Sequence, residues 1–165
     1  MSNIIIYSDP IKVGKTSTVM IWANTDKNVT GILTPDISGK RMLYDIKGKK
    51  IHDFETDETD PNLTVKIGKF TFLKSSFAKA ITILKAEMVN QPEWLVIDEI
   101  GKLEMDGKGL EPDLSSILAY VKLKSPLTKV VLIIRDSLLK DAITRYQLQD
   151  AEVVNYEYFL SKGRQ

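Results

Sequence analysis

The sequence predicts an α/β fold with a mostly parallel, doubly wound sheet, helices on both faces and a small β-hairpin addition. Three continuous apolar runs, residues 4–7, 94–97 and 129–134, have the composition of strands buried on both faces of a parallel sheet. Helical patterns lie between these runs, and this alternation is typical of helices packed around one sheet. Because 165 residues suit one hydrophobic core, we expect a single domain over residues 1–165.

The other expected strands are delimited by turn residues. Residues 29–34 form an apolar run that Pro35 stops. Residues 41–46 and 50–54 flank a short Lys-Gly-Lys turn, which predicts a hairpin. Two further extended segments are expected at residues 64–73 and 153–159.

Four segments carry apolar residues at helical spacing, which predicts helices with one core-facing stripe. Three of them are residues 15–23, residues 112–123 with Pro112 in the first turn, and residues 137–146. The fourth begins after Ser75 or Ser76, either of which can cap it, and ends before Pro92.

The composition excludes several classes of protein. The formal net charge is only +1, so nothing electrostatic indicates nucleic acid or an anionic membrane as a partner. No apolar run approaches the length of a membrane span, and the N-terminal run has no basic flank of the kind that signal peptides carry. There is no cysteine, which rules out disulfides and thiolate metal sites. We therefore expect a cytoplasmic protein and take a monomer as the default.

The first apolar run leads into a loop that ends in Gly14-Lys15-Thr16 and is followed by a helical pattern. This strand–loop–helix context is what a phosphate-binding P-loop requires, because backbone N–H groups and the positive end of the helix dipole then face the phosphates. The residues expected to bind phosphate are Lys12, Val13, Gly14, Lys15, Thr16 and Ser17. Lys15 would reach the β- and γ-phosphates, and the Thr16 hydroxyl would bind Mg²⁺.

The second apolar run ends in Asp98-Glu99, where ligands of open α/β sheets bind. The strand that carries the Mg²⁺-associated aspartate of P-loop NTPases ends in the same way. We therefore expect Asp98 to hold Mg²⁺ and Glu99 to orient and polarise the attacking water. An acid directly after the aspartate favours the branch of P-loop proteins in which another strand separates the two motif strands. The competing interpretation is that the two acids only close a strand end.

Residues 97–105, Ile-Asp-Glu-Ile-Gly-Lys-Leu-Glu-Met, resemble the extended acidic motif of the THEP1-type nucleoside-triphosphatases. Residues 31–41 and 66–70 are similar to two further segments of that family, with matching order and spacing up to about residue 120. The resemblance implies a P-loop NTPase fold and Mg²⁺-dependent hydrolysis of nucleoside triphosphates such as ATP or GTP.

The resemblance also implies candidate site residues, namely several cations and a further acid. Ser38 stands where the family pattern has an arginine, so Arg41 is the best remaining candidate for stabilising phosphate charge. Arg135, after the third apolar run, is a second such candidate, and the alternative for either arginine is an ordinary surface ion pair. Glu104 is either a second acid near the nucleotide or a loop stabiliser, and Lys69 either approaches phosphate or is simply exposed.

Asp9 replaces the first glycine of the P-loop pattern G-x-x-x-x-G-K-[ST]. A carboxylate at ~4 to 8 Å from the phosphates costs on the order of 1–4 kcal/mol of binding, unless its side chain turns out to solvent. Nucleotide binding is expected to survive in weakened form.

Three functions remain open at this point. The first is a slow Mg²⁺-dependent nucleoside-triphosphatase, in which Glu99 acts on water while Lys15 and Arg41 take up the developing charge. The second is a nucleotide-binding switch or accessory protein with little turnover, which Asp9 and Ser38 favour. The third is a small-molecule or nucleotide kinase, against which the lack of a recognisable acceptor pocket or arginine-rich lid counts.

Overall fold

The computed structural model describes residues 2–10 and 14–163, and within them a central sheet of seven strands. Lys12 and Val13, both expected to bind phosphate, lie outside the described residues. In spatial order the strands are β11 (Glu152–Val154), β1 (Ile4–Tyr7), β10 (Lys129–Ile134), β9 (Trp94–Ile100), β2 (Val29–Leu33), β5 (Leu43–Asp45) and β6 (Lys50–His52). The first five run parallel, and the β5–β6 hairpin continues the sheet in the antiparallel sense.

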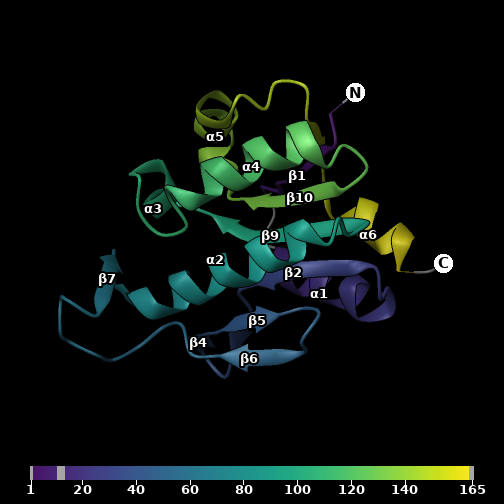
Figure 1. Ribbon diagram of the computed structural model, residues 1–165. Coiled ribbons are helices and arrows are strands. Elements are labelled where there is room, and N and C mark those ends of the chain that lie inside the picture. The colour runs from purple at the N-terminus through teal and green to yellow at the C-terminus, as the bar shows by residue number, and fades with distance from the viewer. Residues whose placement is uncertain (1, 11–13, 164–165) are drawn as a thin grey trace.

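Helices cover both faces of this sheet (Figure 1). One face carries α2 (Lys74–Val89), the short α3 (Lys102–Met105), α4 (Asp113–Lys124) and α5 (Leu139–Tyr146). The other carries α1 (Lys15–Thr25) and α6 (Tyr156–Lys162), which contact each other. The doubly wound α/β architecture is thus confirmed.

The apolar strands divide their side chains between the two faces. In β1, Ile4 and Ile6 join the core beneath α2 and α4, whereas Ile5 and Tyr7 join the core beneath α1 and α6. All four are buried, as expected when successive side chains of a strand point to opposite faces and both faces are covered. Burial on two sides explains why the run is apolar throughout and does not alternate with polar residues.

The order of the strands matters most for the site. Strand β10 lies between β1 and β9, so the strand before the loop and the strand with the two acids are not neighbours. This arrangement confirms the prediction of an intervening strand. Because all three strands are parallel, their carboxyl ends meet at one edge of the sheet.

Several predicted elements are wrong in detail. Residues 64–73 are not one extended segment but a separate hairpin of β7 (Thr64–Ile67) and β8 (Phe70–Leu73), with Gly68 at positive φ in the turn. Residues 153–159 contribute only the end of β11 and then enter α6. Helix α2 begins at Lys74, ahead of both predicted caps, and the Ser76 hydroxyl donates to the carbonyl of Asp53 instead.

Three short elements were not predicted: β3 (Asp36–Ile37) and β4 (Lys40–Arg41), which pair with each other, and α3. The expected helix 137–146 is α5 preceded by a 3₁₀ turn, η1 (Asp136–Leu138). Among the described helices, none has both the length and the apolar character needed to cross a membrane.

Gly31 fixes the spacing between β2 and β9. Its φ is +115°, and a Cβ added there would lie 2.1 Å from the Val96 carbonyl oxygen on the neighbouring strand. That contact is with backbone, which cannot rotate away, so a larger residue must push β2 away from β9.

We therefore predict that Gly31→Ala lowers the free energy of unfolding by roughly 3 kcal/mol, because a steric clash is added to an unfavourable φ. The matched control is Gly39→Ala, where φ is also positive (+81°) but no atom lies within 4 Å of the added Cβ. That variant should lose only about 1 kcal/mol. Urea unfolding of both variants provides the comparison, and equal losses would contradict a role for Gly31 in strand spacing.

Candidate active site

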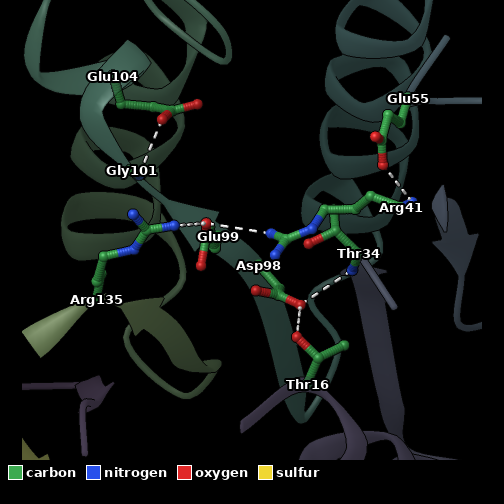
Figure 2. Close-up of polar contacts among 9 residues, drawn as sticks. All are labelled: Thr16, Thr34, Arg41, Glu55, Asp98, Glu99, Gly101, Glu104 and Arg135. Atoms are coloured by element: carbon green, nitrogen blue, oxygen red, sulfur yellow. Dashed lines mark hydrogen bonds and ion pairs between the residues drawn. The ribbon is translucent and has the colours of Figure 1, made fainter. Parts of the chain in front are cut away.

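The candidate site lies at the carboxyl ends of the parallel strands (Figure 2). Asp98 and Glu99 come from the end of β9, Thr34 follows β2, and Arg135 follows β10. Thr16 belongs to the first turn of α1, which follows β1 and the loop. Four segments far apart in the sequence therefore contribute to one cluster, because parallel strands end on the same side.

Asp98 is the centre of this cluster. One of its carboxylate oxygens, Oδ2, accepts hydrogen bonds from the Thr16 hydroxyl at 2.7 Å and from the Thr34 backbone N–H at 2.9 Å. The side chain is buried, with the residue only 1% exposed, and its second oxygen, Oδ1, has no hydrogen-bond partner among the described residues. An orphaned carboxylate oxygen next to a threonine hydroxyl is a donor set that suits a hard cation.

Burial raises the pKa of Asp98 to about 6, and the neighbouring charge of Glu99 acts in the same direction. The hydrogen bonds from Thr34 and Thr16 and the charge of Arg41 oppose this increase. The pKa stays high because the desolvation of a carboxylate outweighs two hydrogen bonds and a partly exposed cation.

Glu99 lies between two arginines. Its Oε1 accepts from Arg41 at 3.3 Å and from Arg135 at 3.4 Å (Figure 2). The pairing of β9 with β10 skips Glu99, since Ile133 lies opposite Asp98 and Ile134 opposite Ile100. Such a bulge lets Asp98 and Glu99 depart from strict alternation and serve the same site. The peptide bond between them is cis.

Arg41 reaches the site from the β3–β4 hairpin. Its backbone N–H donates to Glu55 Oε2 at 2.8 Å, which anchors β4 to the following segment. Its side chain is more enclosed than that of Arg135, with 35% exposure against 59%. The structure thus brings both predicted arginines to Glu99, and each forms an ion pair with its carboxylate.

The loop residues Gly14, Lys15, Thr16 and Ser17 form the start of α1. Gly14 caps the helix with left-handed backbone angles (φ 69°, ψ 66°), and no side chain caps its first turn. The first backbone N–H groups of a helix have no partner within it, so an uncapped start exposes donors to an anion. Lys15 is partly buried there.

Asp9 lies just after β1 and is buried, with only 5% of the residue exposed. Its carboxylate is close enough to Tyr7 to contribute to that residue's raised pKa, of which burial is the main cause. The side chain therefore does not turn out to solvent, which was the exception made to the expected charge penalty.

Glu104 holds the loop after β9 in place. Its two carboxylate oxygens accept the backbone N–H groups of Gly101 at 2.9 Å and Leu110 at 3.2 Å, and the residue is 3% exposed. Burial raises its pKa to about 7. These contacts match the loop-stabilising role, one of the two considered for this residue.

A cavity of about 420 Å³ adjoins the cluster. Thr34, Arg41, Asp98, Glu99 and Arg135 line its polar end, and Glu104 and Lys69 also contribute to its lining. No sequence motif indicated this cavity. Thr34 is likewise a site residue that the sequence analysis missed, although its position after an apolar parallel strand placed it at the same edge as Asp98.

The order of the parallel strands, the Gly-Lys-Thr helix start and the acidic end of β9 together define a P-loop nucleotide-binding fold. A family model described as NTPase matches residues 4–156. The chain therefore belongs to this NTPase family.

Individual relatives agree with this assignment. The chain is 35% identical over 106 residues to the nucleoside-triphosphatase THEP1 of Saccharolobus solfataricus (strain ATCC 35092 / DSM 1617 / JCM 11322 / P2). That match covers 56% of this chain and 57% of the relative, so the similarity spans little more than half of either protein. The crystal structure of THEP1 from the hyperthermophile Aquifex aeolicus matches with a TM-score of 0.68 at 22% identity, over 93% of this chain and 89% of that chain. The structural match supports the fold.

The raised pKa of Glu104 leads to a pH prediction. An unfolded glutamate releases its proton near pH 4.5, whereas folded Glu104 keeps it until about pH 7. Between these values the folded state binds more protons than the unfolded state, so the free energy of unfolding falls as pH rises. Between pH 4 and 8, the free energy of unfolding of the wild type should fall by on the order of 3 kcal/mol relative to that of Glu104→Gln.

Urea unfolding of both proteins across this pH range measures the effect. Glu93→Gln, the same substitution at an exposed residue just before β9, is the control and should differ from wild type by a roughly constant amount within ~0.5 kcal/mol. Parallel pH curves for wild type and Glu104→Gln would show that the buried carboxyl is not linked to folding.

Proposed function

We propose that this protein is a Mg²⁺-dependent nucleoside-triphosphatase that hydrolyses ATP- or GTP-type nucleotides to the diphosphate and phosphate. The observation that carries the proposal is the contact between Thr16 and Asp98, which joins the loop at the start of α1 to the acidic end of β9. Family membership and the name of the curated relative support the same activity.

The phosphates of the nucleotide would lie at the start of α1. The uncapped N–H groups there and the Lys15 ammonium are donors for the β- and γ-phosphates. Lys12 and Val13 complete the proposed phosphate-binding set from outside the described residues. Asp9, buried beside this loop, opposes binding through its negative charge.

Thr16 and Asp98 are the residues that would hold Mg²⁺. The unpartnered Oδ1 of Asp98 and the adjacent threonine hydroxyl fit such a cation. Among the described residues, no group of three or more His, Asp or Glu side chains could hold a metal ion. Mg²⁺ in phosphate-transfer sites is held by one or two carboxylates together with phosphate oxygens and water. When bound, the ion neutralises phosphate charge.

Glu99 is the proposed base that orients the attacking water. Its carboxylate lies one residue beyond Asp98 and is held by Arg41 and Arg135. The Glu99 side chain is 23% exposed and the arginine side chains are 35% and 59% exposed, and ion pairs accessible to water contribute roughly 0–1 kcal/mol each. The arginines can therefore exchange Glu99 for the γ-phosphate at low cost, which would release the carboxylate for water and place positive charge where negative charge develops.

A nucleotide-binding switch with little turnover is the second candidate. The burial of Asp9 favours it, because a carboxylate fixed near the phosphates weakens binding and disturbs their placement.

Release of phosphate from ATP and GTP in the presence of Mg²⁺ tests the proposed activity. Glu99→Gln should lower kcat by about 10²- to 10⁴-fold with nucleotide binding retained, because only the base is lost. Lys15→Ala should weaken nucleotide binding and lower kcat/KM by about 10²-fold or more.

The matched controls are Glu93→Gln and Lys27→Ala, the same substitutions at exposed residues away from the site, and both should retain wild-type rates. Tight binding without phosphate release would favour the switch. If the protein binds no triphosphate at millimolar concentration, both candidate functions are excluded.

Asp9→Asn tests whether the Asp9 carboxylate repels the phosphates of the nucleotide. Removing the carboxylate charge while keeping the side-chain shape should tighten nucleotide binding by about one to three decades, which corresponds to the ~1–4 kcal/mol estimated for like-charge repulsion. Asp9→Gly should do the same, and Asp150→Asn, at an exposed position, should not. Calorimetric titration with a non-hydrolysable triphosphate measures the change; unchanged affinity in Asp9→Asn would show that this carboxylate does not act on the phosphates.

A further inference from the structure

The cavity beside the cluster has an apolar body and one polar end. Phe54, Phe72 and Phe77 form its aromatic wall, with ring centroids 4.5 Å apart for the first two and 5.1 Å apart for Phe54 and Phe77. Phe70 of β8 adds a fourth ring, and Leu103 and Leu110 contribute aliphatic surface. A volume of about 420 Å³ lies within the range of pockets that bind small molecules.

The polar end coincides with the proposed catalytic groups. Asp98 and Glu99 line the cavity, whereas none of the loop residues 14–17 does. The cavity thus approaches the two carboxylates from the side that the phosphate loop leaves open. A molecule in its apolar body would meet Glu99 without contacting residues 14–17, the described part of the proposed phosphate site.

Thr34 supplies the second observation. Its hydroxyl is buried and has no hydrogen-bond partner within the described residues, and the residue is 6% exposed. It lines the cavity next to Asp98, to which its backbone N–H donates. A buried hydroxyl without a partner costs free energy, and a ligand hydroxyl in the cavity would satisfy it.

The charges at this end favour a neutral head group. Arg41 and Arg135 are both paired with Glu99, and Asp98 adds a further carboxylate. The remaining cations of the lining, Lys69 and Lys102, are exposed. The buried part of the polar end therefore holds no unpaired cation for a second anion.

We propose that this cavity binds a neutral alcohol with an apolar body, aromatic or branched, and that this alcohol replaces water as the acceptor of the γ-phosphoryl group. The proposal rests on the proposed function, because the donor is the same bound nucleoside triphosphate. The alcohol oxygen forms a bond to the γ-phosphorus while the bond to the β,γ-bridging oxygen breaks. The products are the phosphate monoester and the nucleoside diphosphate, and the hydroxyl proton goes to Glu99.

Hydrolysis alone does not account for this cavity. A water molecule needs two to four polar partners and only a small space. The aromatic rings of this cavity provide no such partners, and the cavity is much larger than one water molecule requires. An apolar chamber that ends at the base instead positions a larger nucleophile. The kinase hypothesis, disfavoured from the sequence for want of an acceptor pocket, thereby gains the pocket it lacked.

The test uses the full chain with 2-phenylethanol, benzyl alcohol and 3-methylbutan-1-ol as probes at about 10 mM, which detects binding in the millimolar range. Ligand-observed NMR without nucleotide measures occupancy of the cavity. Incubation with γ-³²P-labelled ATP and Mg²⁺ then measures labelled phosphate ester against labelled free phosphate. We expect at least one probe to bind and to form its phosphate ester.

Phe70→Ala is the diagnostic variant, because this ring lines the cavity yet is 40% exposed, so its removal leaves the core intact. It should weaken probe binding and lower the ratio of ester to free phosphate by about tenfold. Tyr120→Ala removes an equally exposed ring from α4, away from the cavity, and should change neither.

Each failure has a distinct signature. Phosphate release from ATP without binding of any probe overturns the acceptor site and leaves the proposed hydrolysis standing. Probe binding that Phe70→Ala abolishes, with phosphate release but no ester, overturns the acceptor role of the bound alcohol. If no triphosphate is bound or turned over at all, the proposed function and this inference both fall.

Discussion

The two hydrogen bonds that Asp98 Oδ2 accepts are the contact on which the site depends. One comes from the Thr16 hydroxyl at the start of α1 and the other from the Thr34 N–H at the end of β2. They tie three separate segments to one buried oxygen, and the strand order β1-β10-β9-β2 brings those segments within reach. A buried carboxylate that lost one of these donors would keep its desolvation cost without compensation. The position of the start of α1 relative to β9 is therefore fixed by side-chain chemistry as well as by the sheet.

Glu99, in contrast to Asp98, is held by contacts that are easily exchanged. Its two arginines share a single oxygen at 3.3 and 3.4 Å, and their side chains are 35% and 59% exposed. Water screens both pairs, so little free energy is lost when an arginine moves to another anion. Asp98 thus provides the rigid part of the site and Glu99 the adjustable part, although the two are adjacent in sequence. The bulge that Glu99 forms opposite β10 allows both acids to face the same edge.

The elements that could be predicted best from the sequence are those whose burial is evident from a short run of residues. Strands β1 and β10 are buried on both faces and could be predicted from their apolar runs. The pair of acids at the end of β9 favoured an intervening strand, and β10 is that strand. Residues 64–73 were misread because strand-like residues continue on both sides of Gly68, and only the turn geometry reveals two strands. Helix α6 was misread as strand because its aromatic residues have strand propensity. Asn155, whose side chain accepts from the Glu157 N–H, was the overlooked signal of a helix start. The cavity could not be predicted, since its aromatic wall is assembled from segments that have no fixed order in space until the sheet forms.

The charge distribution connects the altered loop with the rest of the site. Arg41 and Arg135 pair with Glu99, which follows the buried carboxylate of Asp98, and Asp9 is a further buried carboxylate just after β1. A nucleoside triphosphate brings about four negative charges, of which a divalent cation at Thr16 and Asp98 would compensate only two. The remaining phosphate charge would be repelled by the carboxylates of Asp9 and Glu99. Under the proposed function, the two arginines beside Glu99 would offset part of that repulsion. Because a buried charge is screened less than an exposed one, the Asp9 carboxylate would, under the proposed function, act more strongly on a bound nucleotide than a carboxylate at the surface would.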